Sequence, residues 1–244
     1  MSFTNLLILQ FIAHILTDFT FQNDKLAKDK NEHGAKSKFF KWHIAIVFAL
    51  SWALSFQIKF IFASLAIALL HGVIDGFKKN FLKFEKINKY VFYIDQSLHL
   101  LVITGIVLLF DHYFLIRPYY QLPATTHHLL IISAYLLCTK PVNIIIKEIF
   151  NTYEIKINSP SSENPNPVES EIPNAGKLIG ITERIIALSL ILYGQFAAVG
   201  FIIAGKSILR FKESDLRKAE YVLIGTLLSF GVAILAGIAI LIIK

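Results

Sequence analysis

The sequence is dominated by long runs of apolar residues that contain no charge. Two of the longest cover residues 100–110 and 221–243, and about 20 apolar residues are enough for a helix to cross a bilayer. Within lipid the backbone must satisfy its own hydrogen bonds, which restricts spanning structures to helices and closed barrels. Barrel strands would alternate apolar and polar residues over segments of about ten residues, and the sequence lacks this pattern. It therefore predicts an all-α, polytopic transmembrane helix bundle.

Seven segments are expected to be helical. They cover residues 4–21, 39–57, 60–77, 90–110, 126–150, 179–205 and 219–243. The fifth is interrupted by Pro141, which cannot continue a helix without a break or kink, so it either spans the membrane or is re-entrant or interfacial. The bundle accordingly has six or seven membrane helices. Glycines on the last two segments predict close helix packing there: Gly194, Gly200, Gly205, Gly225 and Gly231.

Residues 151–178 are rich in Ser, Pro, Asn and Glu. This composition is too polar to bury a core and predicts a disordered linker. The linker would divide the chain into an N-terminal helix bundle, residues 1–150, and a C-terminal helical hairpin, residues 179–244, that packs on the bundle.

The positions of Lys and Arg predict location and orientation. The net charge is +7, but the basic residues sit beside apolar segments, which is typical of the positive-inside bias and not of nucleic-acid binding. Lysines concentrate around the connections at residues 25–41 and 78–89, whereas the other two early connections hold only Lys59 and Arg117. We predict a multi-pass protein of the cell inner membrane with the two lysine-rich loops in the cytoplasm. The basic residues at 206–218 fit this topology only if the fifth segment does not span.

Four of the predicted membrane helices contain ionisable side chains, which are costly in lipid and are often functional. The pairs are His14/Asp18, His71/Asp75 and Asp95/His99, and a single histidine, His43, lies on the remaining helix. The two members of each pair are four residues apart, a spacing that places both side chains on one helix face. With the predicted topology, all seven residues lie at the same depth near the cytoplasmic side.

Imidazole and carboxylate groups without a thiolate suit zinc, with manganese or iron as alternatives. We therefore predict that the three His–Asp pairs are ligands of one or two metal ions and that His43 is a further ligand or lies just outside the ligands. Asp75 or Asp95 would be the general base that orients a catalytic water. Gln22, Gln96 and Lys79 are expected to surround the ligands and orient them or a phosphate. Taken alone, each His–Asp pair is also explained by a hydrogen bond that stabilises helix packing.

The sequence resembles a family of bacterial inner-membrane proteins, domain-of-unknown-function family 3307. The resemblance rests on HILTDFTFQ at residues 14–22, HGVIDGFK at 71–78 and DQSLHL at 95–100, and it extends through AVGFIIAGKSILRF and AEYVLIGTLLSF. The His-xxx-Asp pattern is also similar to that of membrane-bound metal-dependent hydrolases and, more distantly, of soluble helical zinc-dependent phospholipases. This second resemblance implies that the three His–Asp pairs bind metal.

These features favour a membrane-embedded metal-dependent hydrolase, with the lipid bilayer as its surroundings. Its substrate would be a lipid or another amphipathic phosphoester at the cytoplasmic leaflet. The same residues would also suit a transporter or a proton or ion relay, although the sequence lacks the internal repeat that many transporters have. A non-catalytic membrane component of a stress or defence system is the third alternative.

Overall fold

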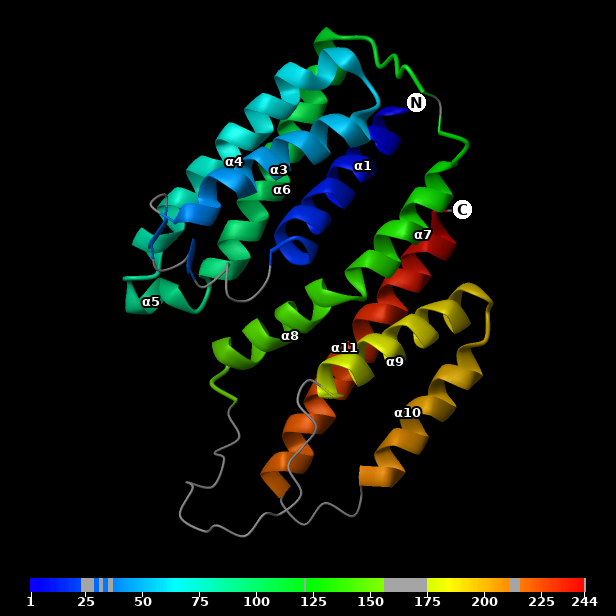
Figure 1. Cartoon of the computed structure of the whole chain (residues 1–244). Coiled ribbons are helices and arrows are strands. Elements are labelled where there is room, and N and C mark those ends of the chain that lie inside the picture. The colour runs from blue at the N-terminus through cyan, green and yellow to red at the C-terminus, as the bar shows by residue number, and fades with distance from the viewer. Residues whose placement is uncertain are drawn as a thin grey trace. The chain divides into compact units, whose positions relative to one another are not determined.

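The computed structural model describes residues 1–22, 29–30, 33–34, 37–120, 122–155, 175–210 and 216–243. The regular secondary structure of these residues is entirely helical (Figure 1), which confirms the all-α class. They form two compact units, residues 1–133 and 134–244. Of the predicted linker, residues 156–174 lie outside the described part of the chain, and the flanking helices extend into both of its ends.

Several helices could span a membrane. Four helical segments among the described residues are long and apolar enough: Phe3–Thr20, Ile58–Phe81, Val91–Tyr113 and Ala219–Ile242. A fifth results if Thr126–Leu137 and Lys140–Thr152, bent by 51° relative to each other, count as one span. Large apolar side chains such as Phe62, Leu101 and Leu109 are exposed on the outer faces, as expected for contact with lipid. The structure therefore fits a membrane helix bundle, and the count of six or seven membrane helices stays a prediction.

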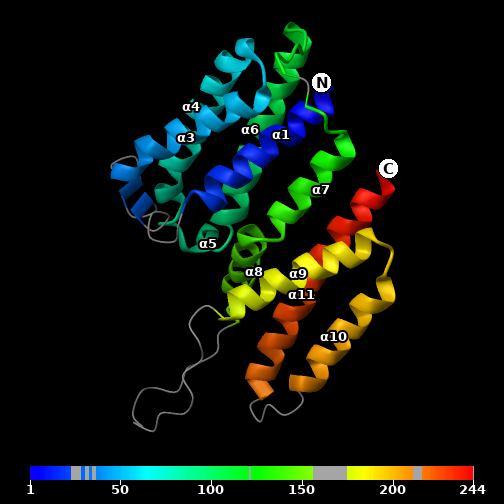
Figure 2. The same ribbon diagram turned by 45° about the vertical axis from the view of Figure 1, so that its right-hand side comes forward.

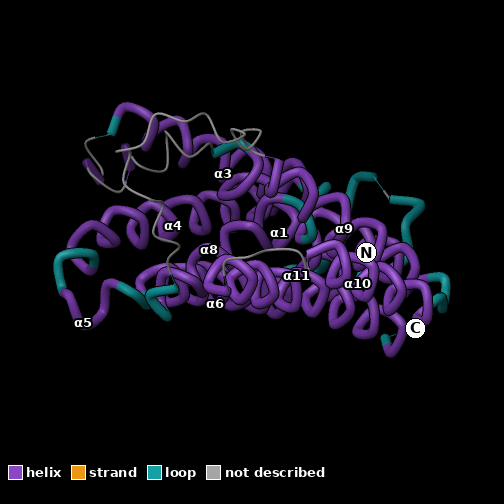
Figure 3. The backbone as a smooth tube through the Cα atoms, turned by 90° about the horizontal axis from the view of Figure 1, so that it is seen from below, coloured by secondary structure: helices purple, strands orange, loops and turns teal. Residues whose placement is uncertain are grey.

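Unit 1 is a bundle of four long helices. They are α1 (Phe3–Ile15), extended by the π-helix η1 (Leu16–Thr20), α3 (Lys38–Ser55), α4 (Ile61–Phe81) and α6 (Val91–Tyr113). Helices α1 and α4 each pack against both α3 and α6 (Figure 2). A short 3₁₀ helix, η3 (Ile58–Phe60), joins α3 to α4, and the turn between α4 and α6 contains α5 (Glu85–Asn88; Figure 3).

The interior of unit 1 changes from apolar to polar along the bundle. Buried positions recur every four residues on each helix, for example Ile67, His71 and Asp75 on α4, because residues four apart lie on the same helix face. The apolar part of this stripe forms a core with members on α1, α3, α4 and α6. This core fixes the rotation of each helix, so the polar members of the same stripes must also point inward.

Unit 2 begins within α7 (Thr126–Leu137) and includes four further helices. They are α8 (Lys140–Thr152), α9 (Ala175–Leu192), α10 (Phe196–Arg210) and α11 (Leu216–Ile242). Helix α9 packs along α11, and α8 and α10 each contact both of them. The break between α7 and α8 lies just before Pro141, which confirms the predicted interruption of the fifth segment.

The prediction of one helix over residues 179–205 is wrong, because α9 ends at Leu192 and α10 begins at Phe196. Gly194 has a φ of +74°, a left-handed conformation that glycine adopts without strain. The backbone N–H of Gln195 donates to the carbonyl of Leu190 over 2.8 Å, which closes the end of α9. Gly194 therefore ends a helix and does not serve close packing.

The other predicted packing glycines also need correction. A Cβ added to Gly200, Gly205 or Gly231 would meet no neighbouring group within 4 Å, and Gly225 has only an ordinary contact with Phe150. The close approach of α9 and α11 lies instead at Gly237. A Cβ on Gly237 would be 2.5 Å from Cγ2 of Ile191.

Candidate metal centre

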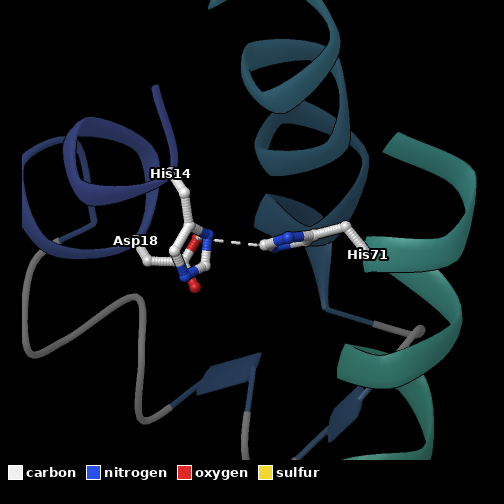
Figure 4. Close-up of side chains that lie close together, drawn as sticks. All are labelled: His14, Asp18 and His71. Atoms are coloured by element: carbon white, nitrogen blue, oxygen red, sulfur yellow. Dashed lines mark ion pairs between the residues drawn. The ribbon is translucent and has the colours of Figure 1, made fainter. Parts of the chain in front are cut away.

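The seven predicted side chains meet at the polar end of unit 1. Six of them are buried, and the Asp18 side chain is only 8% exposed. His14 and Asp18 come from α1 and η1 and face His71 on α4 (Figure 4). His43 on α3 and the Asp95–His99 pair on α6 complete the cluster. Each of the four helices therefore contributes at least one imidazole.

Four side chains, Asp18, His43, His71 and Asp75, lie close together and are called the quartet below. His71 Nε2 lies 3.4 Å from both Asp18 Oδ1 and Asp75 Oδ2. His43 Nε2 lies 3.5 Å from Asp18 Oδ1 and 3.4 Å from Asp75 Oδ2, and the two imidazole nitrogens are 2.9 Å apart. Ligand atoms at about 2.0–2.2 Å from one tetrahedral zinc are roughly 3.3–3.6 Å from one another. Four of these five separations are in that range, so each of the two imidazole nitrogens has the spacing of a zinc ligand to both carboxylate oxygens.

The π-helix η1 positions Asp18 within the quartet. The backbone N–H of Phe21 donates to the carbonyl of Leu16 over 2.9 Å, an i to i+5 bond. Single π-turns of this kind occur often at functional sites. In this position Asp18 Oδ1 is closer to His71 Nε2 across the bundle, at 3.4 Å, than to His14 Nδ1 on its own helix, at 3.8 Å. The sequence contains no signal for this turn.

Asp75, Asp95 and His99 form a second group of possible ligands. One ligand atom from each lies within 4.8 Å of the others. The Oδ1 atoms of Asp75 and Asp95 and both ring nitrogens of His99 are buried without a hydrogen-bond partner among the described residues. Buried polar atoms are nearly always satisfied, so this group has the unused bonding capacity that a metal ion would fill. Asp75 belongs to both groups.

Two lysines that the sequence interpretation did not include also enter the cluster: Lys30, which is buried, and Lys78, whose side chain is 17% exposed. Lys30 Nζ donates to Asp75 Oδ2 over 2.8 Å and lies 3.4 Å from His43 Nε2. Lys78 Nζ donates to Asp95 Oδ2 over 2.9 Å. With neutral imidazoles, two ammonium groups face three carboxylates, which leaves a net charge of −1. Asp18 is the carboxylate without an ammonium partner in the described part of the chain.

The three residues predicted to surround the ligands behave differently. Gln96 Nε2 donates to Asp95 Oδ2 over 3.2 Å, and its Oε1 lies 3.2 Å from His14 Nε2. Because that oxygen accepts, the proton of His14 is on Nε2, and Nδ1 is left with a lone pair toward Asp18. Lys79 lies against Gly34. Lys78, and not Lys79, is the lysine of α4 that lies beside the predicted ligands. The Oε1 atom of Gln22 is buried without a hydrogen-bond partner among the described residues.

Two spaces adjoin the cluster. A cavity of about 10 Å³, lined by His14, Thr17 and His71 among others, has roughly the volume that one water molecule requires. A larger groove of about 200 Å³ lies between α4 and α6 and is lined by apolar side chains together with Lys78 and Asp95. The centre therefore has room for a water on one side and an apolar approach on another.

Comparison with known proteins identifies one family. A family model described as a protein of unknown function (DUF3307) matches residues 6–129. This match contains all seven predicted site residues as well as Lys30 and Lys78. No curated protein and no solved structure matches the chain.

Proposed function

The chain belongs to the DUF3307 family, and from its buried His/Asp centre we propose that it is a membrane-embedded, metal-dependent hydrolase. The observation that carries this proposal is the spacing of the quartet together with the unsatisfied atoms of Asp75, Asp95 and His99. Groups buried in an apolar bundle are normally paired. Within the described part of the chain, both ring nitrogens of His99 lack a hydrogen-bond partner, and so do the Oδ1 atoms of Asp75 and Asp95.

The quartet would hold one ion, and Asp75, Asp95 and His99 would contribute to a second. His14 would join through Nδ1, because Gln96 occupies its other ring nitrogen. Zinc suits these nitrogen and oxygen ligands, with manganese or iron as alternatives. A bound metal of this kind would supply hydroxide near neutral pH and neutralise charge on a phosphoryl group.

The chain's own residues would then orient the reactants. Asp75 or Asp95, whichever does not use its unbonded Oδ1 as a metal ligand, would accept a proton from water, the role of a general base. Lys78 lines the groove between α4 and α6 and also binds Asp95. A phosphate at the end of that groove would have to replace Asp95 as the partner of this ammonium group.

The groove supports a lipid or amphipathic phosphoester as the substrate. Its wall is apolar except at Lys78 and Asp95, so an acyl chain could lie along α4 and α6 while the phosphate reaches the charged residues. We further propose the predicted inner-membrane location, with the loops at residues 25–41 and 78–89 in the cytoplasm. The shorter apolar helices Phe39–Ser55 and Phe196–Ile208 would raise the number of membrane helices toward the predicted six or seven.

Metal analysis of the purified full-length protein tests the proposal. Wild type dialysed against zinc and then against buffer should retain zinc in stoichiometric amount, and His71→Ala and His99→Ala should lose it. His112→Ala is the matched control, because His112 lies on α6 like His99 but is exposed and distant from the cluster. Hydrolysis of short-chain phosphatidic acid, measured as released phosphate, should follow the zinc content. A wild-type protein that retains no metal would refute the hydrolase.

A proton or ion relay is the second candidate, and the two lysines favour it. Lys30 and Lys78 neutralise Asp75 and Asp95 without a metal. Polar side chains also follow one another from Lys78 through Asp95, Gln96, His14, Asp18, His71 and Asp75 to Lys30. The longest step, 3.8 Å from His14 Nδ1 to Asp18 Oδ1, would carry a proton when His14 is protonated on both nitrogens. Metal-free protein in vesicles loaded with a pH-sensitive dye should then conduct protons, and Asp18→Asn should abolish the signal. Vesicles that stay impermeable to protons would exclude this function.

A further inference from the structure

Unit 2 contains a cavity whose lining is strongly basic. Helices α8, α9, α10 and α11 line an open cavity of about 640 Å³, a volume in the range of typical ligand pockets. Among the residues that the structure describes, four cationic side chains line it, Lys147, Lys177, Arg184 and Lys206, together with one carboxylate, Glu183. This charge distribution would attract an anion.

Arg184 lies at the inner wall and is only 1% exposed. Its Nε donates to the carbonyl of Cys138 over 2.7 Å, and its Nη2 donates to the carbonyl of Thr139 over 3.2 Å and to Oδ1 of Asn143 over 2.7 Å. Its Nη1 donates to Oγ of Ser229 over 2.9 Å. Two of these acceptors are backbone carbonyls at the break between α7 and α8, so Arg184 stabilises that break.

The hydrogen bonds do not neutralise the charge of Arg184, because all four acceptors are uncharged groups. The adjacent Glu183 pairs with Lys206 Nζ at 2.5 Å, and no carboxylate forms an ion pair with Arg184 in the described part of the chain. A guanidinium has five N–H groups, and four are used, which leaves one on Nη1. Burying a charge without a counter-charge is costly. A bound anion would neutralise the guanidinium and accept the remaining N–H.

The rest of the lining indicates what kind of molecule carries this anion. Tyr221, Gly225 and Ser229 of α11 line the cavity and lie in the first half of the candidate span Ala219–Ile242. Apolar side chains, including Ile146 and Phe150 of α8, line it as well. An amphiphile could place its charged group among the cationic side chains and its chain against these residues.

We propose that this cavity binds the phosphate group of an anionic amphiphile such as a phospholipid. Guanidinium and ammonium groups together are the usual partners of phosphate. The site shares no residue with the metal centre of unit 1, so it stands whether or not the chain is a hydrolase.

Calorimetric titration of the full-length protein in detergent, with EDTA present, tests the site. The probes are dihexanoyl phosphatidic acid, dihexanoyl phosphatidylcholine and inorganic phosphate. We expect phosphatidic acid to bind most tightly, and the double variant Lys147→Ala/Lys177→Ala to weaken its binding by roughly tenfold or more, as expected for lost charge-assisted contacts. Lys140→Ala is the matched control, because it removes a lysine from α8 that does not line the cavity.

Three results would overturn the proposal. The first is equal binding of phosphatidic acid and phosphatidylcholine, which would show that the anionic headgroup is not recognised. The second is unchanged affinity in the double lysine variant. The third is equally tight binding of inorganic phosphate, which would assign the site to a free anion and exclude the amphiphile. The double variant alters neither Arg184 nor its bonds, so its fold should be preserved, and an unchanged melting temperature checks this.

Discussion

Replacing Lys30 with methionine would remove the ammonium group that neutralises Asp75. The two groups lie 2.8 Å apart, and their side chains are 4% and 1% exposed. Methionine is similar in length to the aliphatic part of lysine, so the change removes the charge without leaving a large cavity. Asp75 would then keep His43 and His71 as its close neighbours, and neither carries an obligatory positive charge.

The expected loss of stability is large. Removing one partner of a buried ion pair costs about 3–5 kcal/mol, because the other charge stays buried. For a chain of this size each kcal/mol lowers the melting temperature by about 2–4 °C. The metal-free variant should therefore unfold roughly 6–20 °C below wild type. A divalent cation beside Asp75 would replace the missing charge, so zinc should restore most of this loss.

Thermal unfolding of the full-length protein in detergent, followed by tryptophan fluorescence, measures the effect. Both tryptophans, Trp42 and Trp52, lie on α3 in the same bundle. The scans compare EDTA with excess zinc, and Lys41→Met, an exposed lysine of α3, controls for loss of charge. A decrease of less than about 2 °C in EDTA would refute the buried pair. An equal decrease with and without zinc would refute metal binding at Asp75.

Three further predictions follow from the structure. Gln96→Ala should weaken zinc binding by about 10–100-fold in a chelator competition assay, because Gln96 orients His14. Gln22→Ala should leave zinc binding unchanged. Equal losses of zinc affinity in the two variants would contradict this role of Gln96. Gly237→Ala should destabilise the protein by about 1–3 kcal/mol, because its Cβ would lie 2.5 Å from Ile191 Cγ2. Gly231→Ala, which has open space, should cost nothing, so equal melting temperatures would refute the close approach. Cysteines introduced at Lys41 and Lys83 should react only with reagents on the cytoplasmic side, while native Cys138 is buried; reaction from outside would contradict the topology.

The helical class and the break before Pro141 could be predicted because both depend on local chemistry, namely apolar runs and a missing backbone N–H. The break after Leu192 could not, since Gly194 interrupts the apolar pattern for only three residues and no proline is present. The sequence also did not indicate that Gly237 is the glycine at which two helices approach closely. Gly231 and Gly237 have similar sequence surroundings, and only the partner helix shows that Ile191 approaches the second.

Part of the candidate site could be predicted from the sequence, because the spacing of residues along one helix is a local pattern. The four-residue spacing of His71 and Asp75 places them on one face, and the loop charges predict a shared depth with the other helices. Lys30 comes from a connection, so its contact with Asp75 depends on the path of the chain. Lys79 was favoured over Lys78 by its four-residue step from Asp75, but Lys78 lies seven residues after His71, nearly two full turns, and so returns to the buried face.

The two lysine–aspartate ion pairs also have a consequence for the biogenesis of the bundle. In each pair the lysine leaves the ribosome before its carboxylate, by 45 residues for Lys30 and Asp75 and by 17 for Lys78 and Asp95. An aspartate at the centre of a singly inserted helix costs about 2.5–3.5 kcal/mol. Lys30 lies in a connection and Lys78 in the last turn of α4, so both lysines can stay hydrated until their carboxylates are made. Asp75 therefore meets a counter-charge as soon as α4 is made, and Lys78 meets Asp95 only with α6. In a membrane, α1, α3 and α4 could therefore be inserted first, with Asp75 already paired to Lys30, and α6 would follow in a second step in which Asp95 pairs with Lys78.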